Sequence, residues 1–108
     1  MKSYNIKHDL PTKTLALERL NVILKYEREP IIKIIHGYGS HGVGGDIKLL
    51  IRQILEEKVN KNEIKAYIPG EAFGHLLGYD YLIKTYLKYL EKDSDYKKVN
   101  EGITYIIL

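Results

Sequence analysis

Residues 31–46 read IIKIIHGYGSHGVGGD and determine which fold the chain can take. The first five include four isoleucines between a proline and a glycine-rich run, which is typical of a buried strand. Residues 36–45 contain five glycines, and Asp46 is a good N-cap for a helix that we expect to end near Lys58. The apolar residues of this helix recur at helical spacing: Ile47, Leu50, Ile51, Ile54 and Leu55. The stretch therefore predicts a strand, a glycine loop and a helix in succession.

The segments on either side continue the alternation of strands and helices. Thr12 is a plausible N-cap for the first helix, and Glu29-Pro30 ends that helix because the residue before proline avoids the α region. We expect strands at 3–7, 63–68 and 103–108, helices at 13–28 and 81–91, and a loop at 93–101. The order βαβα(β)(α)β predicts an α/β (α+β) two-layer sandwich, in which helices pack on a small mixed sheet.

Length and composition indicate a single small domain. The chain has 108 residues, no cysteine and a formal net charge of +3, with 17 Lys+Arg against 14 Asp+Glu. The absence of cysteine excludes disulfide scaffolds, zinc ribbons and thiol catalysis. No apolar run approaches the roughly 20 residues that span a bilayer, and no signal peptide is evident, so we expect a cytoplasmic domain without a membrane partner.

The basic charge is uneven. Residues 1–70 hold 12 Lys+Arg against 8 Asp+Glu, whereas residues 71–108 hold 5 against 6. This asymmetry permits nucleic acid or another phosphate ligand as a partner, although solubility alone calls for a net charge of this size.

The glycine loop is the feature with the clearest chemical meaning. Glycines let the backbone approach a ligand, and the first turn of a helix offers unpaired N–H groups and partial positive charge to phosphate. The alternative is a connection that needs glycine only for tight turning. The loop also matches the pattern G-x-G-x-x-G of dinucleotide-binding folds, but the predicted helix begins three residues too late and the chain is too short for that fold.

His36-Gly37-Tyr38-Gly39, between a strand and a helix that opens Ile47-Lys48, resembles the second motif of the Smr (small MutS-related) domain family. Thr12 and the segment 16–20 resemble that family's first helix. The resemblance covers residues 4–70 and the last strand. It implies a single Smr-like domain over residues 1–108, with an inserted segment at about 71–101.

The resemblance implies a function as well as a fold. Smr domains bind DNA or RNA, and several are metal-dependent nicking endonucleases. By resemblance, the backbone phosphates would be contacted by His36, Gly37, Tyr38, Gly39, Ser40, His41, Gly42, Lys48 and Arg52. Cleavage would use His36 and Asp9 as catalytic residues. Asp9, His41 and Asp46 could contribute to a site for Mg²⁺ or Mn²⁺, although no metal-ligand set follows from the sequence.

Two departures from the family stand out, and the first favours binding over cleavage. The family's first motif, Leu-Asp-Leu-His-Gly, falls on residues 6–10, where Lys7 replaces its Asp and Asp9 replaces its His. The second departure is length, because residues 71–101 form an extra segment; the glycine loop is also longer than usual, and Lys48 stands in for Arg. Simpler roles stay open for each candidate. His36 would hydrogen-bond backbone, Asp9 and Asp46 would serve as turn and cap residues, and His41, Lys48 and Arg52 would be solvated.

Tyrosine is unusually frequent, with ten tyrosines against one phenylalanine. Five of them crowd the inserted segment: Tyr79, Tyr81, Tyr86, Tyr89 and Tyr96. Three roles are open for these tyrosines: they would stack on bases, replace phenylalanine in a partly hydrated core, or form a self-association surface. The last possibility belongs to an alternative function, a non-catalytic protein-interaction module or a module that binds a small phosphorylated ligand.

Overall fold

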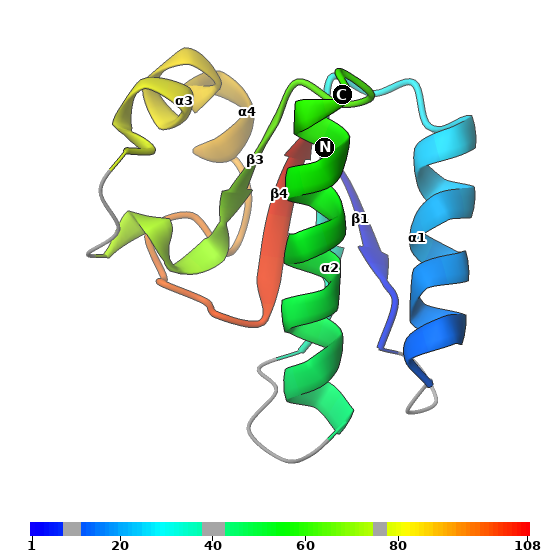
Figure 1. Cartoon of the computed structure of the whole chain (residues 1–108). Coiled ribbons are helices and arrows are strands. Elements are labelled where there is room, and N and C mark those ends of the chain that lie inside the picture. Colours follow the sequence, from blue (N-terminus) through cyan, green and yellow to red (C-terminus); the bar gives the residue numbers. More distant parts are fainter. Residues whose placement is uncertain (8–11, 38–42, 75–77) are drawn as a thin grey trace.

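The computed structural model describes residues 1–7, 12–37, 43–74 and 78–108, and of residues 43–46 it describes the backbone (Figure 1). The elements are β1 (Lys2–Asn5), α1 (Lys13–Tyr26), β2 (Ile31–Ile35), α2 (Val43–Asn60), β3 (Ala66–Pro69), the 3₁₀ helix η1 (Gly70–Phe73), α3 (Asp80–Thr85), α4 (Leu87–Leu90) and β4 (Ile103–Ile107). Within these ranges no helix has the length and apolar character needed to cross a membrane.

The strands form one mixed sheet in the order β1-β2-β4-β3. β1 pairs with β2 in parallel, and β4 is antiparallel to both of its neighbours, β2 and β3. β3 therefore runs in the same direction as β1 and β2. The predicted α+β class, with helices on a small mixed sheet, is confirmed. The topology also brings the carboxyl ends of β1, β2 and β3 to the same edge of the sheet.

One face of the sheet carries α1 and α2 (Figure 1). Alternate residues of a strand point to opposite faces, and in β2 Ile32 and Ile34 point toward these helices. The buried residues of this core are Ile6, Ala16, Leu20, Ile32, Ile34, Ile47, Ile51, Leu55, Ile64 and Ile106. Of the apolar residues predicted to line one face of the second helix, Ile47, Ile51 and Leu55 thus lie in this core and Ile54 packs against it.

The described residues of 71–101 cover the other face, so this part of the domain has a third layer; we keep the name insertion for this segment, as the family resemblance implies it. Its core consists of Ile31, Ile68, Ala72, Leu90, Ile103, Tyr105 and Ile107. Partly buried Tyr79, Tyr86, Tyr89 and Tyr96 pack against that core, whereas Tyr81 is 77% exposed. Most of the tyrosines of the insertion therefore occupy the place of phenylalanines in a half-buried core, as one of the sequence alternatives expected.

Buried Lys33 of β2 forms ion pairs that connect the insertion to the sheet. Its ammonium group lies 3.0 Å from both carboxylate oxygens of Asp93 and 2.7 Å from Asp95 Oδ2. The Tyr105 hydroxyl donates a further hydrogen bond of 2.8 Å to Asp93. Burial alone lowers the pKa of Lys33, but hydrogen bonds to the two carboxylates outweigh burial and raise it. The ammonium group of Lys33 is thus fully paired between the sheet and the third layer, with one carboxylate charge in excess.

Several predicted boundaries are wrong, among them the ends of β1 and α1, which lie at Asn5 and Tyr26 instead of at 7 and 28. α2 begins at Val43, so Asp46 is the fourth residue of the helix and not its N-cap. The predicted helix 81–91 is interrupted at Tyr86, whose φ of −106° and ψ of 17° separate α3 from α4. The third strand starts at Ala66 instead of at 63, after a turn in which Asn62 adopts a positive φ of 60°. Thr12 does cap α1, since its hydroxyl accepts the N–H of Leu15 at 3.2 Å.

Candidate functional site

The parallel strands bring three chemically distinct residues to one edge of the sheet. Lys7 follows β1, His36 follows β2, and Glu71 follows β3 within η1. Ligands of α/β folds commonly bind outside the carboxyl ends of such strands, where the connections to the next helices diverge. This edge also contains the amino end of the 18-residue helix α2. The candidate site therefore lies at this edge of the sheet.

Lys7 and Gly37 lie against each other at the end of the β1–β2 pair. Gly37 has φ of +90°, a conformation that other residues rarely adopt, and a Cβ atom placed on it would lie 3.3 Å from Lys7 Cδ. The N–H groups of His36 and Gly37 both donate to the Gly102 carbonyl at 3.0 Å. These hydrogen bonds fix the direction in which the backbone leaves β2 at Gly37. The aliphatic part of the exposed Lys7 side chain lies beside it.

His36 is buried, with 1% of its surface exposed, and both of its ring nitrogens are engaged. Nδ1 lies 2.9 Å from the Gly37 carbonyl, and Nε2 lies 2.8 Å from Thr104 Oγ1. A carbonyl can only accept, so Nδ1 carries the proton and Nε2 accepts the threonine hydroxyl. Burial and the charges of Arg52 and Lys48 lower the pKa of His36 to about 4. The ring is therefore neutral at pH 7.

The chain of hydrogen bonds continues from His36 through Thr104 to Arg52. The Nε–H of Arg52 donates to Thr104 Oγ1 at 3.2 Å, and one terminal nitrogen donates to the Ile103 carbonyl at 3.2 Å. The two terminal nitrogens also donate to the carboxylate of Glu71 at 2.5 and 2.6 Å. Lys48 Nζ lies 3.3 Å from Glu71 Oε2. We call Lys48, Arg52 and Glu71 the ion-pair cluster.

The ion-pair cluster is largely buried and strongly coupled. The side chains of Lys48, Arg52 and Glu71 are 15%, 17% and 16% exposed. Burial alone raises the pKa of Glu71, but hydrogen bonds and charge from Arg52, with the charge of Lys48, lower it to about 2. Glu71 is thus ionised near pH 7. Lys48 and Arg52 are partners of a carboxylate, so the alternative that both are simply solvated is wrong.

Gly70 determines where Glu71 lies. A Cβ atom on Gly70 would be 2.1 Å from the Asn100 carbonyl oxygen and 2.5 Å from Ile103 Cγ1, closer than any side chain tolerates. The first turn of η1 therefore packs directly on the backbone that leads into β4. This close approach holds the carboxylate of the next residue against α2.

Several predicted site residues lie outside the described part of the chain. These are Asp9 and the loop residues Tyr38, Gly39, Ser40, His41 and Gly42. Asp46 lies in the first turn of α2, and its side chain is not described. In the described ranges no group of three acidic or histidine side chains could hold a metal ion. The predicted Mg²⁺ or Mn²⁺ site therefore stays a prediction, and so does the catalytic role of Asp9.

Two residues of this edge, Lys7 and Glu71, were not predicted as site residues. Lys7 entered only as a departure from the family motif, and Glu71 only as part of the insertion. Lys7 is the last residue of the first predicted strand and Glu71 follows the third, and strands that run in one direction end at one edge. Their positions at the ends of predicted strands were therefore an available signal, once the direction of each strand was known.

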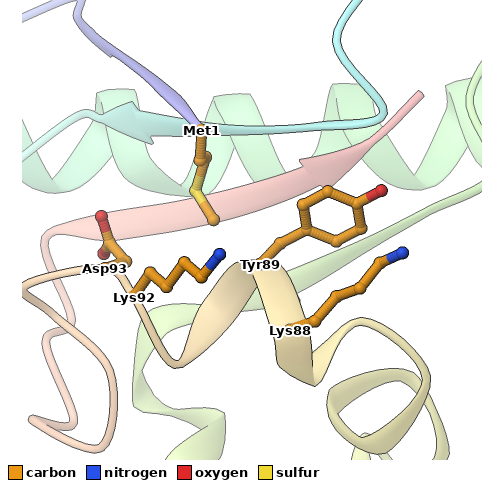
Figure 2. A pocket seen from close by; sticks show the side chains of 5 residues that line it. All are labelled: Met1, Lys88, Tyr89, Lys92 and Asp93. Carbon is orange, nitrogen blue, oxygen red and sulfur yellow. The ribbon is translucent and has the colours of Figure 1, made fainter.

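The described residues also line hollows elsewhere on the molecule. One, of about 400 Å³, is lined by Met1, Lys88, Tyr89, Lys92 and Asp93, and Figure 2 shows Met1 pointing toward the space between Asp93 and Tyr89. Met1 precedes β1, so this hollow lies at the end of the sheet opposite to Lys7. Another of about 400 Å³ follows α1 and β1, and Leu15 and Val22 are exposed along it.

Comparisons with known protein families, with curated proteins and with solved structures gave no match for this chain. The topology of the sheet bears on the dinucleotide alternative. The helix after G-x-G-x-x-G does begin at Val43, directly after the motif, contrary to our expectation. However, antiparallel β4 lies between β2 and β3, so the strand after that helix does not neighbour β2 as the dinucleotide fold requires.

Proposed function

We propose that this domain binds the phosphate backbone of DNA or RNA, without reading sequence, at the carboxyl ends of β1 and β2. The observation that carries the proposal is the contact between Lys7 and Gly37, which places an exposed cation at the start of the glycine loop. The amino end of α2 supports it, because its first N–H groups and its dipole favour an anion. Lysines and backbone N–H groups position phosphates but do not read bases.

His36 has a positioning role in this proposal. Its imidazole holds the Gly37 carbonyl and the Thr104 hydroxyl, and it has no exposed nitrogen with which to exchange a proton with a substrate. A general acid or base has to reach the proton it transfers, directly or through one water molecule. The arrangement therefore supports binding more strongly than cleavage by His36.

The binding test is a fluorescence anisotropy titration with single-stranded and double-stranded DNA and RNA of mixed sequence, at two salt concentrations. We expect affinity that falls steeply with salt and varies little with base sequence, because phosphate contacts release counterions. Binding that is insensitive to salt would contradict the proposal. Adding inorganic phosphate or a mononucleotide as competitor identifies the alternative: displacement by either at low concentration would indicate a small phosphorylated ligand.

Cleavage is tested separately, with supercoiled plasmid in the presence of Mg²⁺ or Mn²⁺. If His36 only positions the loop, the purified domain leaves the plasmid intact. Nicking by the wild-type domain that disappears in His36→Gln would show instead that the catalytic role implied by the family resemblance is correct. The variant must be shown to be folded by circular dichroism, because His36 is buried.

A further inference from the structure

We propose that Glu71 is an internal anion that occupies the position a backbone phosphate would take on Lys48 and Arg52, so that the insertion limits binding at the neighbouring site. This inference rests on the proposed function. It concerns the regulation of the site and explains why two cations that the sequence assigned to phosphate contact another part of the same chain.

The geometry of Arg52 leaves one place for an anion. Its Nε–H is used by Thr104, and one terminal nitrogen also donates to the Ile103 carbonyl. The remaining edge of the guanidinium faces Glu71 with two short hydrogen bonds. Carboxylate and phosphate accept the same two-pronged contact from arginine, so each can replace the other at this edge.

Lys48 adds a second positive charge to the same position. Its ammonium group lies 3.3 Å from the Glu71 oxygen that also accepts from Arg52, and 3.9 Å from Glu101. Two cations thus converge on one carboxylate oxygen. The positive charges of Lys48 and Arg52 also lower the pKa of His36, which follows β2. The ion-pair cluster therefore lies close to the carboxyl end of that strand.

Glu71 comes from the insertion, while both cations come from α2. A phosphate would therefore replace a contact between α2 and η1, and it would leave Gly70 and the close packing behind it in place. Protonation does not release the cations near neutral pH, because the pKa of Glu71 is about 2. Lys48 and Arg52 therefore become accessible near neutral pH when a competing anion displaces the Glu71 carboxylate.

The experiment compares Glu71→Gln with wild type and with Glu91→Gln. Both variants raise the net charge by one, but Glu91 is an exposed residue of the insertion that follows α4. We expect Glu71→Gln to bind mixed-sequence DNA or RNA about tenfold more tightly at low salt, with a salt slope steeper by about one, and Glu91→Gln to change neither appreciably. Lys48→Ala in the Glu71→Gln background should remove most of the gain.

Each outcome separates this inference from the function on which it rests. Tight binding by wild type that Glu71→Gln does not improve would overturn the inference and leave the proposed function standing. Binding by Glu71→Gln alone would support both. Absence of binding in both proteins would overturn the proposed function and the inference with it.

A measurement on the wild-type chain covers the case in which Glu71→Gln fails to fold. The Nε–H resonance of Arg52 is followed by ¹⁵N NMR as an oligonucleotide is added. We expect this resonance to shift together with the amide of Gly37. A Gly37 amide that shifts while Arg52 stays unchanged at saturation would show that Glu71 keeps its place, which would also overturn the inference.

Discussion

Arg52 and Glu71 lie 19 residues apart in the chain and meet through two parallel hydrogen bonds of 2.5 and 2.6 Å. The pair joins the middle of α2 to the start of the insertion, beside the edge where β1, β2 and β3 end. Its burial and its two-pronged geometry make it more than an exposed surface contact. We therefore expect both the stability of the fold and the accessibility of the basic residues to depend on this pair.

Arg52→Ala should destabilise the domain strongly. The change leaves the carboxylate of Glu71 largely buried without its main partner, and breaking such a pair from one side costs about 3 kcal/mol. Urea unfolding followed by circular dichroism measures the loss. Gln53→Ala, at the next and exposed position of α2, serves as the control and should change the free energy of unfolding by less than about 0.5 kcal/mol. Equal losses in the two variants would contradict the argument.

His36 should make the domain sensitive to mild acid. The unfolded imidazole takes up a proton below its ordinary pKa of 6.5, whereas the folded one does so only near pH 4. The stability due to the neutral ring is therefore complete above pH 6.5 and is lost as the pH falls from 6.5 to about 4, by up to about 3 kcal/mol.

The measurement is the free energy of unfolding between pH 7.5 and 4 for wild type and for His36→Gln. The variant is expected to be less stable at neutral pH and to lose less stability across this window. Parallel curves would show that His36 does not titrate as its contacts imply. Glu71 acts in a separate window: its lowered pKa stabilises the fold above its ordinary pKa of 4.5, and this contribution is lost as the pH falls toward about 2.

Lys33, Asp93 and Asp95 should make strongly coupled contributions to the free energy of unfolding. Lys33→Met leaves Asp93 and Asp95 facing a buried strand without a cation, and we expect a loss of about 3 kcal/mol. In a background that carries Asp93→Asn and Asp95→Asn, the same change should cost less than about 1 kcal/mol, since no buried charge is then left unpaired. A double-mutant cycle from urea unfolding measures the coupling. Additive losses would contradict it.

Gly70 and Gly78 are required for different reasons, the first steric and the second conformational. Gly70→Ala should cost more than about 2 kcal/mol, because the new methyl group would meet the Asn100 carbonyl at 2.1 Å. Gly78 has φ of +93° but nothing within 4 Å of its Cβ position, so Gly78→Ala should cost only about 1 kcal/mol. Thermal unfolding of both variants tests the difference. A milder effect at Gly70 than at Gly78 would rule out the close packing of η1 on β4.

Much of the fold could be predicted because its signals are local. The isoleucine run of β2, the helical spacing of α1 and α2 and the apolar end of the chain each depend on neighbouring residues only. The start of α2 was misplaced because Gly44 and Gly45 have low helix propensity, and the surrounding structure overrides it. The break at Tyr86 has no comparable signal in the local sequence.

The site was harder to predict because its partners are distant in sequence. Lys48 and Arg52 were recognised as basic residues on one helix, but their partner Glu71 depends on where β3 ends and on the close approach at Gly70. Lys7 likewise meets Gly37 only through the parallel pairing of β1 and β2. Lys33 lies within an isoleucine run, and its partners are two aspartates of the distant polar segment 93–101, so local sequence does not indicate the ion pairs.

The central claim is that phosphate binds beside Lys7 and Gly37, and the salt dependence of nucleic-acid binding by Lys7→Ala tests it most directly. Lys61→Ala is the matched control, since Lys61 is an exposed lysine just beyond the carboxyl end of α2, opposite to the proposed site. The account predicts weaker binding for Lys7→Ala, with the slope of log K against log salt reduced by about one, and an unchanged slope for Lys61→Ala. Equal slopes for wild type and both variants would contradict it.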